Sequence, residues 1–399
     1  MVRMKSWRNT GHTNAVARQF LGPGHGDLET PALVLDQDRM EQNIARMRAS
    51  LARFDVAFRP HVKTSKSIQV TRATLGQANG PITVSTLKEA EYFAANGFTD
   101  ILYAVGIVPG KLDHVIRLRR QGIRLAVVLD SLEMAQALCD KARGGNTRFD
   151  VMIEIDSDGH RSGVVPDAPE LLDIGRCLAG GGQHLAGVIT HAGNSYNCRS
   201  IPAIRQMAQQ ERDAAVGCAE RLRAAGIACP AVSIGSTPTA LFADNLDGVT
   251  EVRAGVFVFG DLVMAGLGVC RQQDIALSVL TTVIGHQKEK GWIITDAGWM
   301  AMSRDRGTSK QAVDQGYGLV CDLGGALLPD VLMVDANQEH GVIAHRSGDP
   351  AQTPDLPIGA MLRIVPNHAC ATGAQHSRYH VVSRDATDIL DVWDRFRGW

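Results

Sequence analysis

Hydrophobic residues along this chain gather in short runs, and helical patterns separate most of these runs. The run Thr30–Asp36 predicts a first strand, and a helix follows with Met40, Ile44 and Met47 on one face. Eight further runs predict strands: Val56–Arg59, Ile82–Ser85, Ile101–Val105, Leu125–Asp130, Val151–Asp156, Leu185–His191, Ala231–Gly235 and Val249–Val252. This alternation predicts an α/β fold with a parallel (β/α)8 barrel of the TIM type over residues 37–274, and a doubly wound sheet is the alternative.

Polar side chains follow the ends of many different predicted strands, which favours the barrel. Barrel active sites are built from the loops after several strands, whereas a doubly wound sheet concentrates polar residues at one switch point. No GxGxxG motif follows the first strand either. The polar residues at strand ends are Lys63, Ser85, Arg161, His191, Ser236 and Arg253.

Beyond residue 275 the pattern changes to alternating hydrophobic and polar positions, with glycine and proline between the runs. We expect a second, mostly antiparallel β domain over residues 275–399 together with residues 20–36, which supply the first strand. Residues 1–19 contain basic residues but no acidic ones, and we expect an exposed arm there. The strands predicted in this domain are Ala276–Ile284, Trp292–Asp296, Val331–Asp335, Gly341–Ala344 and Met361–Val365.

The amino-acid composition limits the kinds of partner that the protein is expected to bind. The 41 basic residues nearly balance the 42 acidic ones, so the charge gives no reason to expect a nucleic acid or a membrane, and a small-molecule ligand is the better expectation. No apolar stretch approaches the roughly 20 residues of a membrane helix. The 8 cysteines show no regular spacing, so we expect a cytoplasmic protein with reduced thiols.

One lysine stands where a nucleophilic amine is useful. Lys63 comes just after a predicted strand, with Arg59 and His61 on alternate residues before it and Lys66 after it. Crowding by other cations would favour the neutral amine, which can form a Schiff base with an aldehyde cofactor. The alternative is a solvated surface lysine.

Two loops have the composition of a phosphate site. Gly235–Thr239 follows the seventh barrel strand and Arg253–Val256 follows the eighth, the positions at which barrels often hold a phosphate. In the loops after the fifth and sixth strands, Arg161 could bond an anionic phenolate, His191 could pack on a flat ring and Tyr196 could meet a ring nitrogen. Each residue alone is more often structural, but together they would surround one planar, phosphorylated aldehyde.

Near the carboxyl terminus, His368 and Cys370 occupy alternate residues of a segment predicted to be extended, so their side chains point the same way. Imidazole and thiolate are ligands for first-row metals. Two protein ligands would leave positions for water and substrate, as in a catalytic site. A packed histidine and thiol without metal is the alternative.

Several motifs together resemble a known family. DGHRSG, THAG and VRAGV resemble the fold-type III pyridoxal-phosphate enzymes, of which alanine racemase is the founding member. TPALVLD, RPHVKTSK, GSTPT and PNHACATG resemble more narrowly the metal-dependent D-serine dehydratase and D-threonine aldolase family. The similarity covers about residues 28–399 in the same order.

The resemblance implies a pyridoxal 5'-phosphate site and a divalent metal site. Lys63 would attach the cofactor and exchange the Cα proton, and His368 with Cys370 would hold the metal. We expect zinc, with manganese or cobalt as alternatives, and a homodimer. The other residues expected at the cofactor are His61, Arg161 at the phenolate, His191 at the ring, Tyr196 at the pyridine nitrogen, Arg253, and Ser236, Thr237, Gly255 and Val256 at the phosphate.

Differences from the alanine racemases and D-threonine aldolases indicate which reaction to expect. Alanine racemases lack the HxC pair, and D-threonine aldolases resemble this chain but have an aspartate in place of Cys370. A metal that helps a β-hydroxyl to leave favours dehydration. We therefore expect β-elimination of D-threo-3-hydroxyaspartate to oxaloacetate and ammonia, or of D-serine to pyruvate and ammonia. The alternatives are a metal-dependent aldolase and a pyridoxal-phosphate carrier, although a carrier has little use for the β domain.

Overall fold

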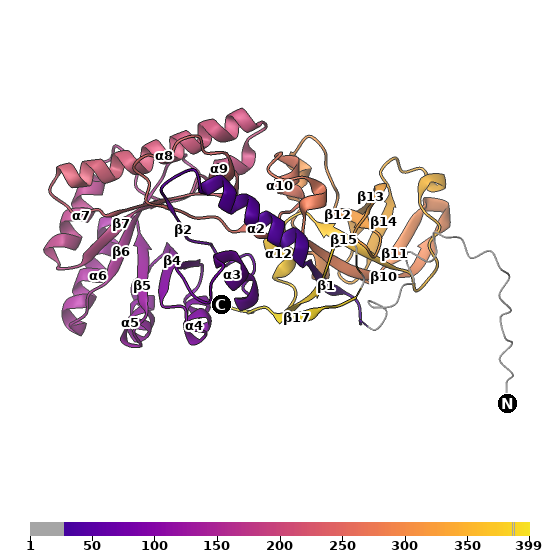
Figure 1. Cartoon of the computed structure of the whole chain (residues 1–399), viewed down its shortest axis with the longest axis horizontal. Coiled ribbons are helices and arrows are strands. Elements are labelled where there is room, and N and C mark those ends of the chain that lie inside the picture. Colours follow the sequence, from indigo (N-terminus) through magenta and orange to yellow (C-terminus); the bar gives the residue numbers. More distant parts are fainter. Residues whose placement is uncertain (1–27, 385, 387) are drawn as a thin grey trace. The chain divides into compact units, whose positions relative to one another are not determined.

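The computed structural model of the chain describes residues 28–384, 386 and 388–399 (Figure 1). The arm expected over residues 1–19, and residues 20–27 of the expected β domain, lie outside the described residues. The chain forms two compact units. The barrel unit contains Asp38–Ala276, His368–Arg378 and Trp393–Trp399, and the sheet unit contains the described residues up to Gln37, within Leu277–Asn367 and within Tyr379–Val392.

Eight parallel strands form the sheet of the barrel unit, in the order β2-β9-β8-β7-β6-β5-β4-β3. Residues 60–62 continue β2 and close this sheet onto β3, because Thr83 N–H donates to Pro60 O and Val62 N–H donates to Thr83 O, both at 2.9 Å. The predicted (β/α)8 barrel is therefore confirmed. The strands are β2 (Ala57–Phe58), β3 (Ile82–Val84), β4 (Asp100–Gly106), β5 (Arg124–Leu129), β6 (Asp150–Ile155), β7 (His184–Thr190), β8 (Ala231–Ile234) and β9 (Glu251–Val252).

Helices follow the strands of the barrel in turn (Figure 1). Side chains from four neighbouring strands, Leu102, Val128, Met152 and Ile189, pack into one apolar cluster on the sheet. The helices of the barrel unit are α2 (Gln37–Leu51), α3 (Ile68–Leu75), α4 (Leu87–Ala95), α5 (Leu112–Arg120), α6 (Leu132–Gly145), α7 (Glu170–Gly180), α8 (Ile201–Ala224), α9 (Thr237–Phe242), α10 (Leu262–Gly266) and α12 (Ala369–Gly373).

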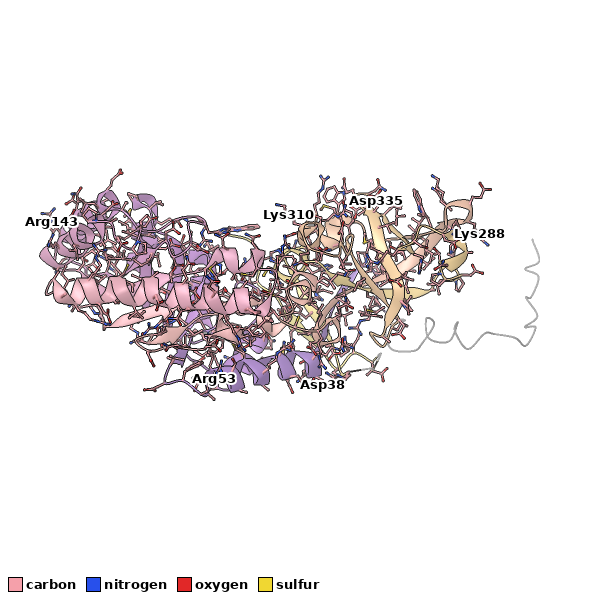
Figure 2. All side chains as sticks on the ribbon, turned by 90° about the horizontal axis from the view of Figure 1, so that it is seen from above. Asp38, Arg53, Arg143, Lys288, Lys310 and Asp335 are labelled. Atoms are coloured by element: carbon pink, nitrogen blue, oxygen red, sulfur yellow. The ribbon has the colours of Figure 1, made fainter. Side chains whose placement is uncertain are left out.

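Helix α2 shows how the sequence pattern becomes structure. Its residues Met40, Ile44 and Met47 are almost fully buried, as the helical spacing predicted. Asp38 lies in the first turn, where an acidic side chain complements the helix dipole, and Arg53 lies just beyond the other end (Figure 2). Among the described residues, no helix is both long and apolar enough to cross a membrane.

The sheet unit is built on a mostly antiparallel sheet, in which β1 and β16 pair in parallel, and the sheet closes through a pairing of β10 with β11. As predicted, the first strand belongs to this sheet: β1 (Ala32–Asp36) pairs with β10 (Leu277–Gln287) and with β16 (Arg378–Val382). The sequence pattern did not predict β12 (Gly318–Cys321), β16 or β17 (Asp391–Asp394). The remaining strands are β11 (Trp292–Thr295), β13 (Leu327–Ala336), β14 (Gly341–His345) and β15 (Met361–Pro366), and a short helix, α11 (Trp299–Met302), follows β11.

Residues His368–Arg378 group with the barrel unit, although the sequence assigns them to the β domain. The cause is visible in two contacts. The Thr64 hydroxyl lies 3.2 Å from Cys370 Sγ, and Ala369 N–H donates to the buried carboxylate of Asp261 at 3.0 Å. The segment that carries the HxC pair is therefore bound to barrel loops. The prediction that this segment is extended was wrong, because His368 caps α12 and Cys370 lies within this helix.

Candidate active site

The loop of residues 61–67 follows β2 and carries Lys63 on an exposed turn. Lys63 N–H lies 3.5 Å from His61 Nδ1, and His61 itself forms the backbone bridge to Thr83 that closes the barrel. The loop is thus fixed at its start by the barrel sheet, while the Lys63 side chain remains accessible.

Two of the cations expected to crowd Lys63 are neutralised by ion pairs. Arg59 bonds to Glu251 at 2.6 Å and to Asp100 at 3.0 Å, and Lys66 Nζ lies 2.9 Å from a carboxylate oxygen of the fully buried Glu89. The sequence could not reveal these acidic partners, because all of them come from other strands and helices. The surroundings of Lys63 are therefore less positive than the local sequence suggests.

Two imidazoles near Lys63 are held neutral. Burial lowers the pKa of His191 from its usual 6.5 to about 3, with further lowering by the charges of Lys63 and Arg253. Burial also lowers the pKa of His61 well below its usual value. The neutral His191 donates from Nδ1 to the carbonyl oxygen of Gly235 at 3.0 Å, so its ring orientation is fixed. A neutral, oriented ring suits the expected packing on an aromatic cofactor.

The two predicted phosphate loops come together with the Lys63 loop. Phe257 N–H donates to Thr237 Oγ1 at 3.2 Å, which joins the loops after β8 and β9. Among the described residues, the N–H groups of Gly255 and Val256 have no hydrogen-bond acceptor. Backbone donors without partners, at a barrel loop after the last strand, fit a phosphate group.

Glycine is required where these loops pass closest to other backbone. Gly255 has no space for a Cβ atom, which would lie 2.7 Å from His61 O. Gly235 has φ +130°, and a Cβ there would lie 2.3 Å from Arg253 O. These contacts explain why the loops after β2, β8 and β9 can converge.

Arg161 lies in the loop after β6, with an exposed side chain 3.4 Å from Glu154. The positive charge of Arg161 helps to lower the pKa of His191, although burial and the charges of Lys63 and Arg253 have larger effects. Arg161 therefore acts on the same site.

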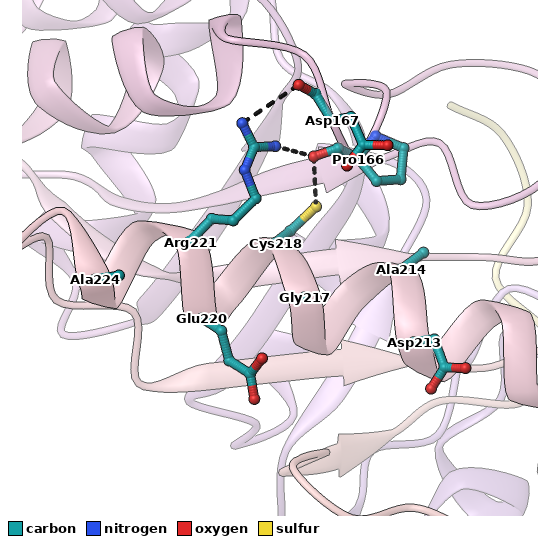
Figure 3. A pocket seen from close by; sticks show the side chains of 9 residues that line it. All are labelled: Pro166, Asp167, Asp213, Ala214, Gly217, Cys218, Glu220, Arg221 and Ala224. Carbon is teal, nitrogen blue, oxygen red and sulfur yellow. Dashed lines mark hydrogen bonds between the residues drawn. The ribbon is translucent and has the colours of Figure 1, made fainter.

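Helix α8 anchors the far end of the loop after β6. Arg221 donates to the carbonyl oxygens of Pro166 and Asp167, and the Cys218 thiol donates to that of Pro166 (Figure 3). Pro166, Asp167, Cys218 and Arg221, which make these bonds, also line the surface pocket in Figure 3.

Tyr196 and Ser236 lie together at the loop after β8. The Tyr196 ring is 6.0 Å from the His191 ring, and the backbone of Thr237 hydrogen-bonds its hydroxyl. Burial, with Cys370 and Asp261, raises the pKa of Tyr196 above its usual value, so the phenol stays protonated. Ser236 caps α9 by accepting from Thr239 N–H, and its hydroxyl lies 2.9 Å from that of Ser195.

His368 and Cys370 lie in the same site through Thr64, the residue after Lys63. Burial alone would raise the pKa of Cys370, but the hydrogen bonds from His368 and Thr64 and the charge of Lys63 bring it below its usual value. A thiol with a lowered pKa and an adjacent imidazole fit a divalent metal. In the part of the chain that the structure describes, no group of three or more histidine, cysteine, aspartate or glutamate residues could hold a metal ion. A metal held by two protein ligands would have open positions for water and substrate.

Three polar residues of the site were not found from the sequence. They are Thr64, Asp261 and Glu211, and all three are almost fully buried. Glu211, on α8, accepts the N–H of Ala192 at 2.8 Å and that of Gly235 at 3.1 Å with the same oxygen. An acidic residue on an otherwise apolar helix face was the only sequence signal available for Glu211.

Glu211 should be replaceable by glutamine but not by alanine. Glutamine keeps the Oε1 acceptor for both N–H groups, whereas alanine leaves two buried donors unpaired, at about 1–3 kcal/mol each. We expect Glu211→Ala to lower the free energy of unfolding by about 2–6 kcal/mol, measured by urea denaturation. Equal losses in Glu211→Gln and Glu211→Ala would contradict this role.

His191 should make the protein less stable in acid. The folded state keeps this ring neutral down to pH about 3, whereas the unfolded chain takes up a proton below pH 6.5, so the free energy of unfolding falls as the pH falls between these values. His191→Asn can keep the bond to Gly235 without titrating. Its free energy of unfolding should fall less steeply over the same range, and identical slopes for both proteins would refute the assignment.

Comparison with known families places the chain among enzymes. The family model described as "Alanine racemase, N-terminal domain" matches residues 35–263, and the "Putative serine dehydratase domain" matches residues 276–382. These two matches cover the barrel and most of the β sheet.

Individual relatives cover nearly the whole chain. D-threo-3-hydroxyaspartate dehydratase of Delftia sp. is 55% identical over 93% of this chain and 98% of its own length. Its solved structure matches with a TM-score of 0.91, covering 94% of this chain and 100% of that chain. Solved variants of it include a cysteine-to-alanine mutant described as the metal-free form and a histidine-to-alanine mutant.

More distant relatives have related names. D-serine dehydratase of Dictyostelium discoideum is 30% identical over 94% of this chain and 98% of its own length. The structure of D-threonine aldolase from Filomicrobium marinum is 25% identical, with a TM-score of 0.78 over 92% of this chain and 95% of that chain. The chain therefore belongs to the alanine racemase-like enzyme family that includes the D-threo-3-hydroxyaspartate and D-serine dehydratases.

Proposed function

We propose that this protein is a pyridoxal-phosphate- and metal-dependent dehydratase that converts D-threo-3-hydroxyaspartate to oxaloacetate and ammonia. The observation that carries the proposal is the 3.2 Å contact of Thr64 with Cys370, which brings the HxC pair next to Lys63. An amine base and a potential metal pair that are brought together in this way suit a reaction that removes a proton from Cα and a hydroxyl from Cβ.

The chain's own residues have separable tasks. Lys63 would hold the cofactor and would be the base for the Cα proton, and neutral His191 would pack on the ring. Gly255 and Val256 would offer backbone N–H groups to the phosphate, and Arg161 would hold the phenolate. Pyridoxal phosphate, when bound, supplies the electron sink that stabilises negative charge at Cα.

His368 and Cys370 act on the other half of the substrate. A divalent metal held by this pair would act as a Lewis acid that favours departure of the β-hydroxyl. The proton lost from Cα and the hydroxyl lost from Cβ together make one water molecule. Another water then hydrolyses the released enamine, which gives the 2-oxo acid and ammonia.

D-Serine is the second candidate substrate, supported by the 30% identical D-serine dehydratase of Dictyostelium discoideum. An aldolase is less well supported, because the aspartate expected of such enzymes is Cys370 here. Zinc is the proposed metal, and a homodimer in the cytoplasm is the proposed state of the enzyme.

A substrate panel tests the reaction. We expect oxaloacetate and ammonia from D-threo-3-hydroxyaspartate, with loss of turnover after chelation and recovery when zinc is restored. His368→Ala should lose turnover, whereas His376→Ala, a histidine of the same segment, should keep it. Glycine plus an aldehyde would instead indicate an aldolase, and the absence of any product would indicate a carrier.

Lys63 can be tested without substrate. Lys63→Ala should lose the visible absorbance of covalently attached cofactor, because no other amine is assigned to that role. Lys88→Ala, on the exposed face of α4, is the matched control and should keep it. Retention of the absorbance in Lys63→Ala would overturn the assignment.

A further inference from the structure

The last residues of the chain contact the loop that carries Lys63. Phe396 N–H donates to Lys66 O at 2.7 Å, and the Phe396 ring stacks on Tyr92 of α4 at 5.1 Å. The Lys66 ammonium lies 5.7 Å from the Phe396 ring and 5.4 Å from the Trp399 ring. Figure 1 accordingly marks the C-terminus beside α3 and α4.

Lys66 needs this support because its backbone is strained. Its φ of 45° lies in the left-handed region, which a lysine rarely adopts. Its N–H donates to Val62 O at 2.7 Å, and its ammonium pairs with buried Glu89, so the barrel fixes one side of the residue. Phe396 fixes the other side, and the turn between Val62 and Lys66 contains Lys63.

The same tail segment also contacts the HxC segment. Arg395, which is almost fully buried, donates its N–H to Ser377 O at 2.8 Å. Its guanidinium packs at the end of α12, where a Cβ on Gly373 would lie 3.4 Å from Arg395 Nε. Adjacent residues of the tail therefore hold the two segments that meet at the contact of Thr64 with Cys370.

We infer that Trp393–Trp399 is a positioning clamp that sets the Lys63 loop against the segment of His368 and Cys370. The inference rests on the proposed function for its catalytic meaning, but its structural part does not depend on the substrate. Phe396 and Arg395 act through other residues and touch no reacting atom. The clamp supplies the alignment between the amine and the potential metal pair, on which the rate of a two-site elimination depends.

Phe396→Ala should release both segments at once. Hydrogen exchange, followed by mass spectrometry on the full-length protein, should become faster in residues 62–67 and in residues 369–377. With D-threo-3-hydroxyaspartate, kcat should fall on the order of tenfold, with a smaller change in KM, since alignment rather than binding is lost. Phe396→Tyr keeps the stacked ring and should restore both readouts.

Phe54→Ala is the matched control, because Phe54 is also half-buried in the barrel unit with a cation, Arg53, 4.6 Å from its ring. It should leave exchange in both segments and kcat unchanged. Unchanged exchange in the two segments of Phe396→Ala would overturn the clamp whatever the substrate is. If exchange in Phe396→Ala becomes faster but kcat does not fall, the clamp has no catalytic role. If exchange becomes faster but the wild-type protein shows no turnover, the result counts against the proposed function alone.

Discussion

A buried chain of charges beneath the site is the constraint on which the rest depends. Arg59 of the β2 extension binds Glu251, Glu251 accepts from Ser233 of β8 at 2.7 Å, and Ser233 accepts from Arg253 at 2.9 Å. Arg253 also donates to Thr190 O, at the end of β7. The network thus joins the strands that lead into Lys63, His191, Ser236 and Gly255.

This network contributes more to the geometry of the strands than to the free energy of unfolding. Burying charges costs desolvation energy that ion pairs repay only when the geometry is good, and removing one partner leaves a buried charge unpaired. Burial and neighbouring charges compete at Arg59, yet Glu251 and Asp100 leave its pKa raised. Because each guanidinium has fixed donor directions, the network sets strand register at the mouth of the barrel. The loops that follow these strands are positioned by that register.

Sequence periodicity was enough to predict the barrel strands, because each is a run of apolar residues bounded by turns. It failed for β17, where Asp391 and Asp394 flank a very short run, and for β12, which lies among glycines and aspartates. The motif residues could be predicted because their chemistry is recognisable in short stretches. Thr64 could not, since its partner Cys370 is 306 positions away, and neither could the acids that neutralise Arg59 and Lys66.

The domain boundary was misplaced for the same reason. Asn367 is fixed in the sheet unit, where its side-chain oxygen accepts from Thr308 Oγ1 at 2.6 Å, and the next residue, His368, already groups with the barrel. The chain rejoins the barrel unit a second time at Trp393, after β16 has paired with the sheet. Both segments that rejoin the barrel unit are short, so hydrophobic patterning gives no sign of them. They nevertheless bring the HxC pair and the tail to the loop of Lys63, so the partners of the lysine depend on two short segments that follow the predicted barrel.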